Sequence, residues 1–253
     1  MSYSPSELLV TMAARRLLDG MSVFAGVGLP LLAAALARET HAPSLQILVE
    51  GGVLDPEMVP GRLPVSTNEM RVAHRATMLM GITDTFLYAQ RGFLDVGFIG
   101  GAQVDRFGNV NSSIIGPIDH PRVRLPGSGG ANDIASLCRQ VIVVMLHEKR
   151  RFVPRVDFVT SPGFLTGGNS RRQAGLQFGG VAAVITNLAM LGFDPIERTL
   201  RIDALHPGVS IDDVQAATGF PVPPAADLGH TNPPNDTELT VLRSLDPDRR
   251  YLG

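Results

Sequence analysis

The chain has 253 residues, of which 44% are hydrophobic and 18% are charged, and its formal net charge is −2. This is the composition of an ordinary globular protein, so it excludes a disordered chain. The nearly balanced charge gives no electrostatic reason to expect nucleic acid or an anionic membrane surface as a partner.

The N-terminal fifth of the chain predicts two helices that alternate with two strands. The first helix runs from Ser6 to about Leu18, with Ser4 or Ser6 as its N-cap. An Ala/Leu-rich helix then lies between two short apolar strands that end in glycine turns: strand 21–30, helix 31–43 and strand 45–52. A strand, a glycine turn, a helix and a second strand form a βαβ unit, which predicts a parallel sheet.

The rest of the chain continues the alternation. The expected elements are a helix, an apolar strand, a turn-rich segment, a buried strand, two late strands joined by a hairpin and a short helix with Ser210 as N-cap: 83–92, 94–105, 107–113, 139–147, 180–194, 199–208 and 210–220. From 221 onward Pro, Asp and Asn become frequent, and one further helix is expected at 236–245.

These elements predict an α/β fold with an open, mostly parallel sheet flanked by helices. We expect a single domain over 1–253, with its core at about 5–220 and a peripheral tail over 221–253. No apolar run reaches about 18 residues, so no membrane-spanning helix is expected. Cys138 is the only cysteine, which predicts a reducing, cytoplasmic setting and a buried structural thiol.

Four glycine clusters follow predicted strands or stand in loops nearby: 26–28, 51–52, 100–101 and 127–130. Tight turns after strands need glycine in any case, so each cluster alone is weak evidence. Ligands of open α/β sheets bind beyond the carboxyl ends of the strands, and the four clusters together therefore favour one shared site. The segment 26–31 lacks the third glycine of a dinucleotide fingerprint, and no P-loop is present.

Glu50 stands at the end of the apolar run 47–49 and directly before Gly51 and Gly52. A carboxylate in this position would be partly stripped of water, which makes it a better nucleophile or base. The alternative is a surface acid on a loop or a charge near a helix N-terminus. The residues themselves favour neither interpretation.

The histidines do not predict a metal site, because all six are widely spaced and no two are separated by four residues. His147 begins a charged segment, 147–151, directly after the buried strand. A solvated turn is the favoured interpretation of this segment. The alternative is an anion site for phosphates of a substrate or coenzyme.

Four segments, taken in order, resemble the β subunit of family I CoA-transferases and are most similar to glutaconate CoA-transferase: 47–60, 98–116, 127–133 and 147–164. The similarity spans roughly residues 5–220 and fades in the tail. It implies an acyl-CoA:carboxylate CoA-transferase that works through a glutamyl-CoA thioester. CoA esters are then substrates, and neither a permanently bound cofactor nor a metal is expected.

By this resemblance Glu50 is the nucleophile. The family commonly has Ser-Glu-Asn-Gly here, and Val49 and Gly51 replace the serine and asparagine. The resemblance also assigns oxyanion and substrate contacts to Asn111, Gly129 and Gly130, and a coenzyme loop to Gly26, Val27 and Gly28.

The resemblance further implies a homologous α subunit and an α2β2 heterotetramer acting on a dicarboxylic or related acyl-CoA. An arginine of 68–76 or 167–173 could hold a second carboxylate, although surface arginines are the more common case. Relatives on the same fold also predict two alternatives, a ring-cleaving carbon–carbon hydrolase of the steroid-degradation type and a decarboxylase. A non-catalytic structural or coenzyme-binding subunit is a third.

Overall fold

The computed structural model describes residues 1–253, and these fall into two compact units. Unit 1 comprises residues 1–98 and 233–253, and unit 2 comprises residues 99–232. We describe each unit by itself. The expectation of a single domain over 1–253 stays a prediction.

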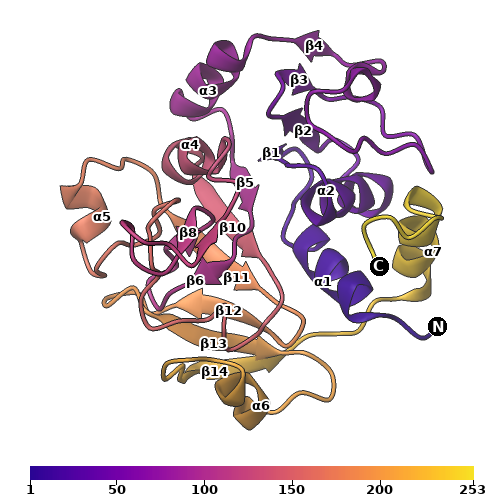
Figure 1. Ribbon diagram of the computed structural model, residues 1–253. Coiled ribbons are helices and arrows are strands. Elements are labelled where there is room, and N and C mark those ends of the chain that lie inside the picture. Colours follow the sequence, from indigo (N-terminus) through magenta and orange to yellow (C-terminus); the bar gives the residue numbers. More distant parts are fainter. The chain divides into compact units, whose positions relative to one another are not determined.

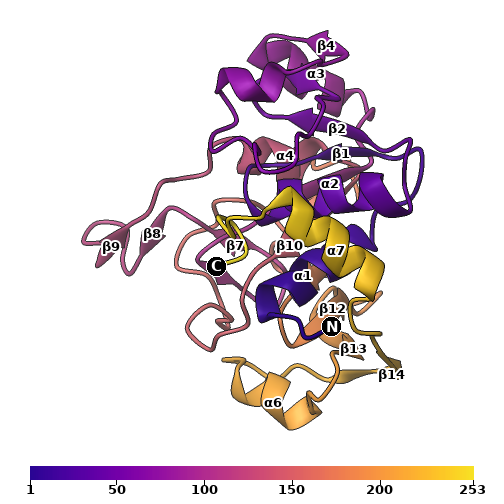
Figure 2. The same cartoon turned by 90° about the vertical axis from the view of Figure 1, so that its right-hand side faces the viewer.

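Three helices pack together in unit 1: α1 (Pro5–Ala14), α2 (Leu29–Thr40) and α7 (Asp236–Leu245) (Figure 2). The N-cap of α1 is Ser4, which forms a capping box with Glu7. The helix ends at Ala14, four residues before the expected Leu18, and the chain then turns. Residues 31–37 of α2 are all buried, as expected for a helix without a polar face.

Helices α1 and α7 are also joined by two ion pairs that run in opposite directions. Arg243 of α7 donates through Nε to the buried Glu7 at 2.7 Å, and Arg15, at the end of α1, donates through Nη2 to Glu238 of α7 at 2.7 Å. Both glutamates additionally accept the backbone N–H of their helix cap, Glu7 from Ser4 and Glu238 from Asn235. The two ends of the chain are therefore fixed to each other.

The strands of unit 1 are ordered β5 (Val96–Ile99), β1 (Ser22–Phe24), β2 (Gln46–Val49), β3 (Val53–Leu54) and β4 (Met78–Leu79) (Figure 1). Strand β1 pairs in parallel with both β2 and β5, whereas β2–β3 and β3–β4 are antiparallel. A 3₁₀ helix, Met70–Ala73, and helix α3 (Ile82–Gln90) complete the unit. The predicted βαβ unit over 21–52 is confirmed.

The main strands of unit 2 are ordered β14 (Pro224–His230), β13 (Leu200–Leu205), β12 (Ala189–Phe193), β11 (Val181–Ile185) and β10 (Gln140–Val144). Pairs β10–β11 and β13–β14 are parallel, and pairs β11–β12 and β12–β13 are antiparallel. Two small hairpins, β6–β7 and β8–β9, have strands Gln103–Val104, Val110–Asn111, Ile114–Ile115 and Val123–Arg124. The helices are α4 (Ala131–Leu137), α5 (Ser170–Gln173) and α6 (Ile211–Ala216).

The α/β class with parallel strands and flanking helices is confirmed, and Ser210 caps α6 as expected. Two expectations about the strands were wrong. The segment 180–194 forms two strands, β11 and β12, so there are three late strands before 208 instead of two. The segment after 221 contributes β14 as well as α7. Both misses involve turns with weak sequence signals.

Candidate active site

Glu50 lies in the turn of the β2–β3 hairpin. Val49 ends β2, and the turn is closed by a hydrogen bond from the Gly52 N–H to the Val49 carbonyl at 2.9 Å. The residue is half-buried, between the two environments that the sequence left open. Its carboxylate makes no hydrogen bond or ion pair with the protein, so its oxygens are available to react.

The glycines after Glu50 are required by the fold of the chain itself. A Cβ at Gly51 would lie 2.4 Å from the carbonyl oxygen of Thr67, and one at Gly52 would lie 2.0 Å from that of Met80. Gly52 also has φ +88°, which favours glycine. The hypothesis that these glycines leave space for a thioester is therefore corrected, because backbone of the same chain occupies that space.

The Gly26–Gly28 loop follows β1, the parallel neighbour of β2. Phe24 is paired with Leu48, and the N–H of Ala25 donates to the Leu48 carbonyl at 3.0 Å. The loop and Glu50 thus follow the carboxyl ends of two adjacent parallel strands. No atom lies within 4 Å of a Cβ built on Gly26 or Gly28, and Gly28 has φ +101° at the start of α2. In contrast to Gly51 and Gly52, these glycines face open space.

Asn111 lies in unit 2 and is fully buried, with its side-chain amide committed to the protein. Its Nδ2 donates to Gln103 Oε1 at 2.7 Å and to the Ile114 carbonyl at 2.6 Å. Its Oδ1 accepts from the Ser113 N–H at 3.0 Å and from the Thr160 hydroxyl at 3.4 Å. The structure thus shows Asn111 as an organiser of the 111–114 segment, and its contact with substrate stays a prediction.

The glycine loop 127–130 lies beside Asn111. The Gly127 N–H donates to the Ser112 carbonyl at 2.9 Å, and the loop leads into α4. The N–H groups of Gly129 and Gly130 have no acceptor in the chain, so they are available as donors.

Thr160 joins Asn111 to this loop, and no sequence pattern points to it. Its hydroxyl accepts from the Ser112 N–H at 2.9 Å, and its carbonyl accepts from Asn132 Nδ2 at 2.8 Å. The sequence-predicted residues of unit 2 are therefore held together through a threonine that lies far from them along the chain.

The first residue of the charged segment 147–151 is not solvated, so the favoured expectation was wrong there. His147 is buried, with its ring stacked on Phe152, and it contacts the hydroxyls of Thr186 and Thr218 at 3.1 and 2.9 Å. Burial lowers its pKa to about 4. Its neighbours after 147 do reach the surface.

Arg150 and Arg151 of the same segment both pair with Glu148, at 2.6 and 3.3 Å. They also line a cavity of about 270 Å³ together with Ala102, Gln103 and Ile115. This cavity follows the carboxyl end of β10. It is a place where the alternative interpretation, an anion site, can be realised.

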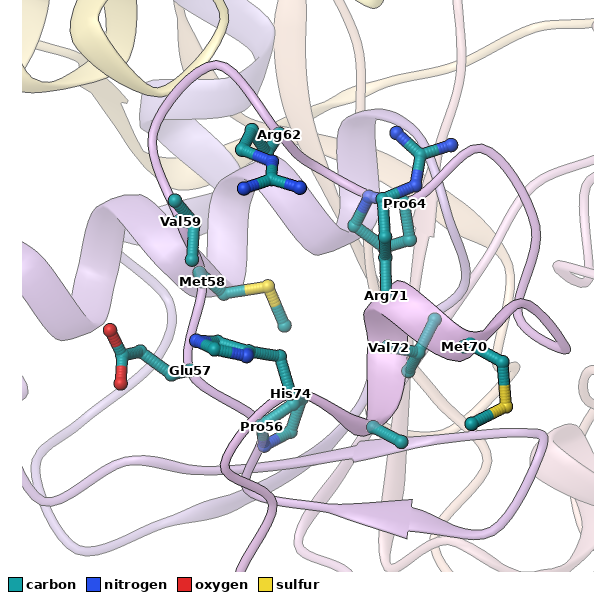
Figure 3. A pocket seen from close by; sticks show the side chains of 11 residues that line it. Pro56, Glu57, Met58, Val59, Arg62, Pro64, Met70, Arg71, Val72 and His74 are labelled. Atoms are coloured by element: carbon teal, nitrogen blue, oxygen red, sulfur yellow. The ribbon is translucent and has the colours of Figure 1, made fainter.

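A cavity of about 340 Å³ in unit 1 is lined by residues of the segments 56–64 and 70–74. Figure 3 shows the guanidinium groups of Arg62 and Arg71 on one side of the opening, with Met58 and His74 on the other. Arg71 pairs with Glu69 at 2.8 Å, and Arg75 with Glu57 at 3.0 Å. Both arginines of 68–76 are therefore already paired with acids.

Comparison with known proteins identifies the family. The family model described as Coenzyme A transferase matches residues 7–217. The chain is 39% identical to the β subunit of 3-oxoadipate CoA-transferase of Pseudomonas knackmussii, covering 97% of this chain and 94% of that one. It is 35% identical to the β subunit of glutaconate CoA-transferase of Acidaminococcus fermentans, covering 99% and 96%. The crystal structure of glutaconate CoA-transferase from that organism superimposes with a TM-score of 0.92 at 33% identity, covering 100% and 98%.

The chain therefore belongs to the coenzyme A transferase family, and it is a CoA-transferase of the β-subunit type. The resemblance on which the sequence analysis relied is confirmed, as is the fold class.

Relatives with other chemistry share this fold. The cholesterol ring-cleaving hydrolase IpdB subunit of Rhodococcus jostii is 31% identical, covering 89% of this chain and 88% of that one. The crystal structure of the decarboxylase AibA/AibB superimposes with a TM-score of 0.84 at 30% identity, covering 99% and 98%. Membership of the family thus leaves the reaction to be argued from the site. No helix of the chain has the length and apolar character needed to cross a membrane.

Proposed function

We propose that this chain is the subunit of an acyl-CoA:carboxylate CoA-transferase that carries the nucleophile, Glu50. The observation that supports this most strongly is the unpaired carboxylate of Glu50 in the β2–β3 turn, next to the open Gly26–Gly28 loop. A carboxylate reacts slowly with a thioester in water. Fixing it on a tight turn beside the thioester carbonyl lowers that barrier, because orientation and loss of solvent are settled before the reaction.

The reaction has two displacements on each side of a covalent intermediate. A Glu50 oxygen attacks the acyl-CoA carbonyl, and CoA leaves as a thiolate, giving an acyl–glutamyl anhydride. The thiolate then attacks the glutamyl carbonyl, and the acyl group leaves as a free carboxylate, giving the glutamyl-CoA thioester. The acceptor carboxylate reverses these two steps and departs as its own CoA ester. No redox partner or metal is required.

Each tetrahedral intermediate carries an oxyanion that needs hydrogen-bond donors. We assign this role to the free N–H groups of Gly129 and Gly130, with Asn111 holding the adjoining segment and contacting substrate. The loss of one such donor typically costs about 3 kcal/mol in the transition state. The Gly26–Val27–Gly28 loop is assigned to the coenzyme, because backbone without side chains can approach a ligand closely.

The substrate class and the assembly follow from the relatives. Glutaconate and 3-oxoadipate, named in two of them, are both dicarboxylates, and this supports a dicarboxylic or related acyl-CoA. Both relatives are named as one of two kinds of subunit, which supports a companion α subunit and an α2β2 heterotetramer. CoA esters act as substrates with no permanently bound cofactor. The single buried Cys138 supports a cytoplasmic setting.

The test is to trap the thioester in the complete complex. Incubation with acyl-CoA followed by borohydride should modify a peptide containing Glu50, as shown by mass spectrometry. Glu50→Ala should abolish both the modification and CoA transfer, whereas Glu39→Ala, an acid on α2, should change neither. Full transfer activity in Glu50→Ala would refute the proposal and would favour a structural subunit.

The second candidate is a CoA-ester-dependent carbon–carbon hydrolase, favoured by the similarity to the IpdB subunit. It predicts product from an acyl-CoA when no acceptor acid is present. The decarboxylase predicts release of carbon dioxide under the same conditions. Turnover that depends strictly on an added carboxylate would exclude both.

A further inference from the structure

A cavity of about 560 Å³ in unit 2, beside α5 (Figure 1), has an uneven distribution of charge. Its lining includes three arginines, Arg171, Arg172 and Arg198, and no acidic residue. A cavity of this size can hold a small molecule. Three cations without an acid among the lining residues favour an anionic one.

Arg171 places a fixed positive charge in the cavity wall. The residue is 4% exposed, and its guanidinium donates to four backbone carbonyls at 2.7–3.0 Å, those of Ala135, Pro162, Gly163 and Phe178. No carboxylate offsets the charge. Burial lowers its pKa to about 10, so the group is still cationic at neutral pH. Because its donors are used by the chain, Arg171 acts on a ligand through its field.

Arg198 and Arg172 have donors to offer. The Arg198 guanidinium lies over the ring of Phe164, 5.2 Å from its centroid, and Phe164 is itself held edge-on by Phe193 at 4.9 Å. The acid nearest to Arg198 on its N-terminal side beyond Glu197 is Asp194, whose carboxylate accepts the backbone N–H groups of 196 and 197. Arg172 is exposed on α5, and neither arginine forms an ion pair.

The cavity lies at the opposite strand end from the cavity of the 147–151 segment. Gly179, in its lining, donates its N–H to the carbonyl of Arg139, directly before β10, and residue 181 begins β11. The 147–151 segment follows the other end of β10. Because β10 and β11 are parallel, the two cavities are at opposite ends of the same strands.

We propose that this cavity binds a phosphate-bearing small molecule, with Arg172 and Arg198 donating to the phosphate oxygens. The guanidinium group matches phosphate in bidentate geometry, and hydrogen bonds between charged groups are the strong ones. Gly168 and Gly175 leave the lining open, since no atom lies within 4 Å of a Cβ built on either. The site goes beyond the proposed function and does not depend on Glu50. The phosphate could come from coenzyme A or from a separate phosphorylated molecule.

The test is calorimetric titration of the full-length chain with inorganic pyrophosphate. The wild type should bind saturably at one site, and Arg172→Gln/Arg198→Gln should bind about a hundredfold more weakly, because each lost charge-assisted hydrogen bond costs about tenfold. Arg155→Gln, an exposed arginine of unit 2 outside the cavity, is the matched control and should bind like the wild type. Circular dichroism verifies that each variant is folded.

Absence of saturable pyrophosphate binding, or equal affinity in the double variant, would overturn the proposal. A second titration with coenzyme A then identifies the source of the phosphate. If coenzyme A displaces pyrophosphate and loses affinity in the double variant, the coenzyme supplies it. If coenzyme A leaves pyrophosphate bound, the ligand is a separate phosphorylated molecule. Both results uphold the site, and neither bears on trapping at Glu50.

Discussion

The rings of His147 and Phe152 lie face to face, with their centroids 3.8 Å apart and their planes 15° from parallel. Burial in this stack lowers the pKa of His147 to about 4. The unfolded chain takes up a proton at His147 below its ordinary pKa of 6.5, and the folded chain does not do so until about pH 4. The stability contributed by the neutral ring is therefore lost as the pH falls from 6.5 towards 4.

We predict that the free energy of unfolding falls by about 2 kcal/mol through His147 between about pH 7.5 and about pH 5. Urea unfolding at the two pH values measures this. His147→Gln should show a smaller decrease. A residual decrease is expected, because burial also lowers the pKa of His206. An equal decrease in the variant would show that His147 is not the group that titrates.

Gly52→Ala should strongly destabilise the hairpin that carries Glu50. Its φ of +88° costs an alanine about 1–2 kcal/mol, and its Cβ would also overlap the carbonyl of Met80. Gly20→Ala is the matched control, because its φ is +76° but nothing lies within 4 Å of its Cβ. Thermal unfolding should show a clearly larger loss for Gly52→Ala. Similar losses would mean that the Met80 segment moves aside easily.

Asn111→Asp should destabilise unit 2 by about 2–4 kcal/mol, because a carboxylate oxygen replaces an NH₂ group that donates to two oxygens. In the control, Asn187→Asp, the contacting atom is an Oδ1 that accepts the His147 N–H, and aspartate keeps that oxygen. Urea unfolding of both variants provides the comparison. If both lose the same stability, the hydrogen bonds of Asn111 do not organise the segment.

Cys138 should be unreactive in the folded chain. It is fully buried, and burial raises the pKa of its thiol to about 12, so almost no thiolate is present near neutral pH. A thiol reagent such as DTNB should label the single cysteine in denaturant and leave it essentially unlabelled without denaturant, with Cys138→Ser as the blank. Rapid labelling of the native protein would indicate local opening around α4.

The parts of the fold that sequence patterns predict are those with local signals. The glycine turns and the apolar runs identify β1, α2 and β2, and Ser210 identifies the start of α6. The turn between β11 and β12 has no glycine or proline. It is instead formed by the Thr186 hydroxyl, which accepts the N–H groups of Leu188 and Ala189, and this bond is not visible as a sequence pattern.

The candidate site divides in the same way. Glu50 stands out because an acid after an apolar run is unusual, and the family resemblance adds its role. The burial of His147 could not be foreseen, since its partners Thr186 and Thr218 are 39 and 71 residues away. Charge runs are normally solvated, but contacts at that separation decided otherwise. Thr160 likewise lies 49 residues from Asn111.

The ion pairs between α1 and α7 determine when the protein can be completed during synthesis. Unit 1 is made of residues 1–98 and 233–253, so its first segment leaves the ribosome long before its last. All of unit 2 is synthesised in between. Until residues 233–253 emerge, Glu7 and Arg15 lack these α7 partners and α2 lacks the cover of α7. The turn that carries Glu50 belongs to this unit, so the predicted nucleophile is translated early but reaches its final surroundings last.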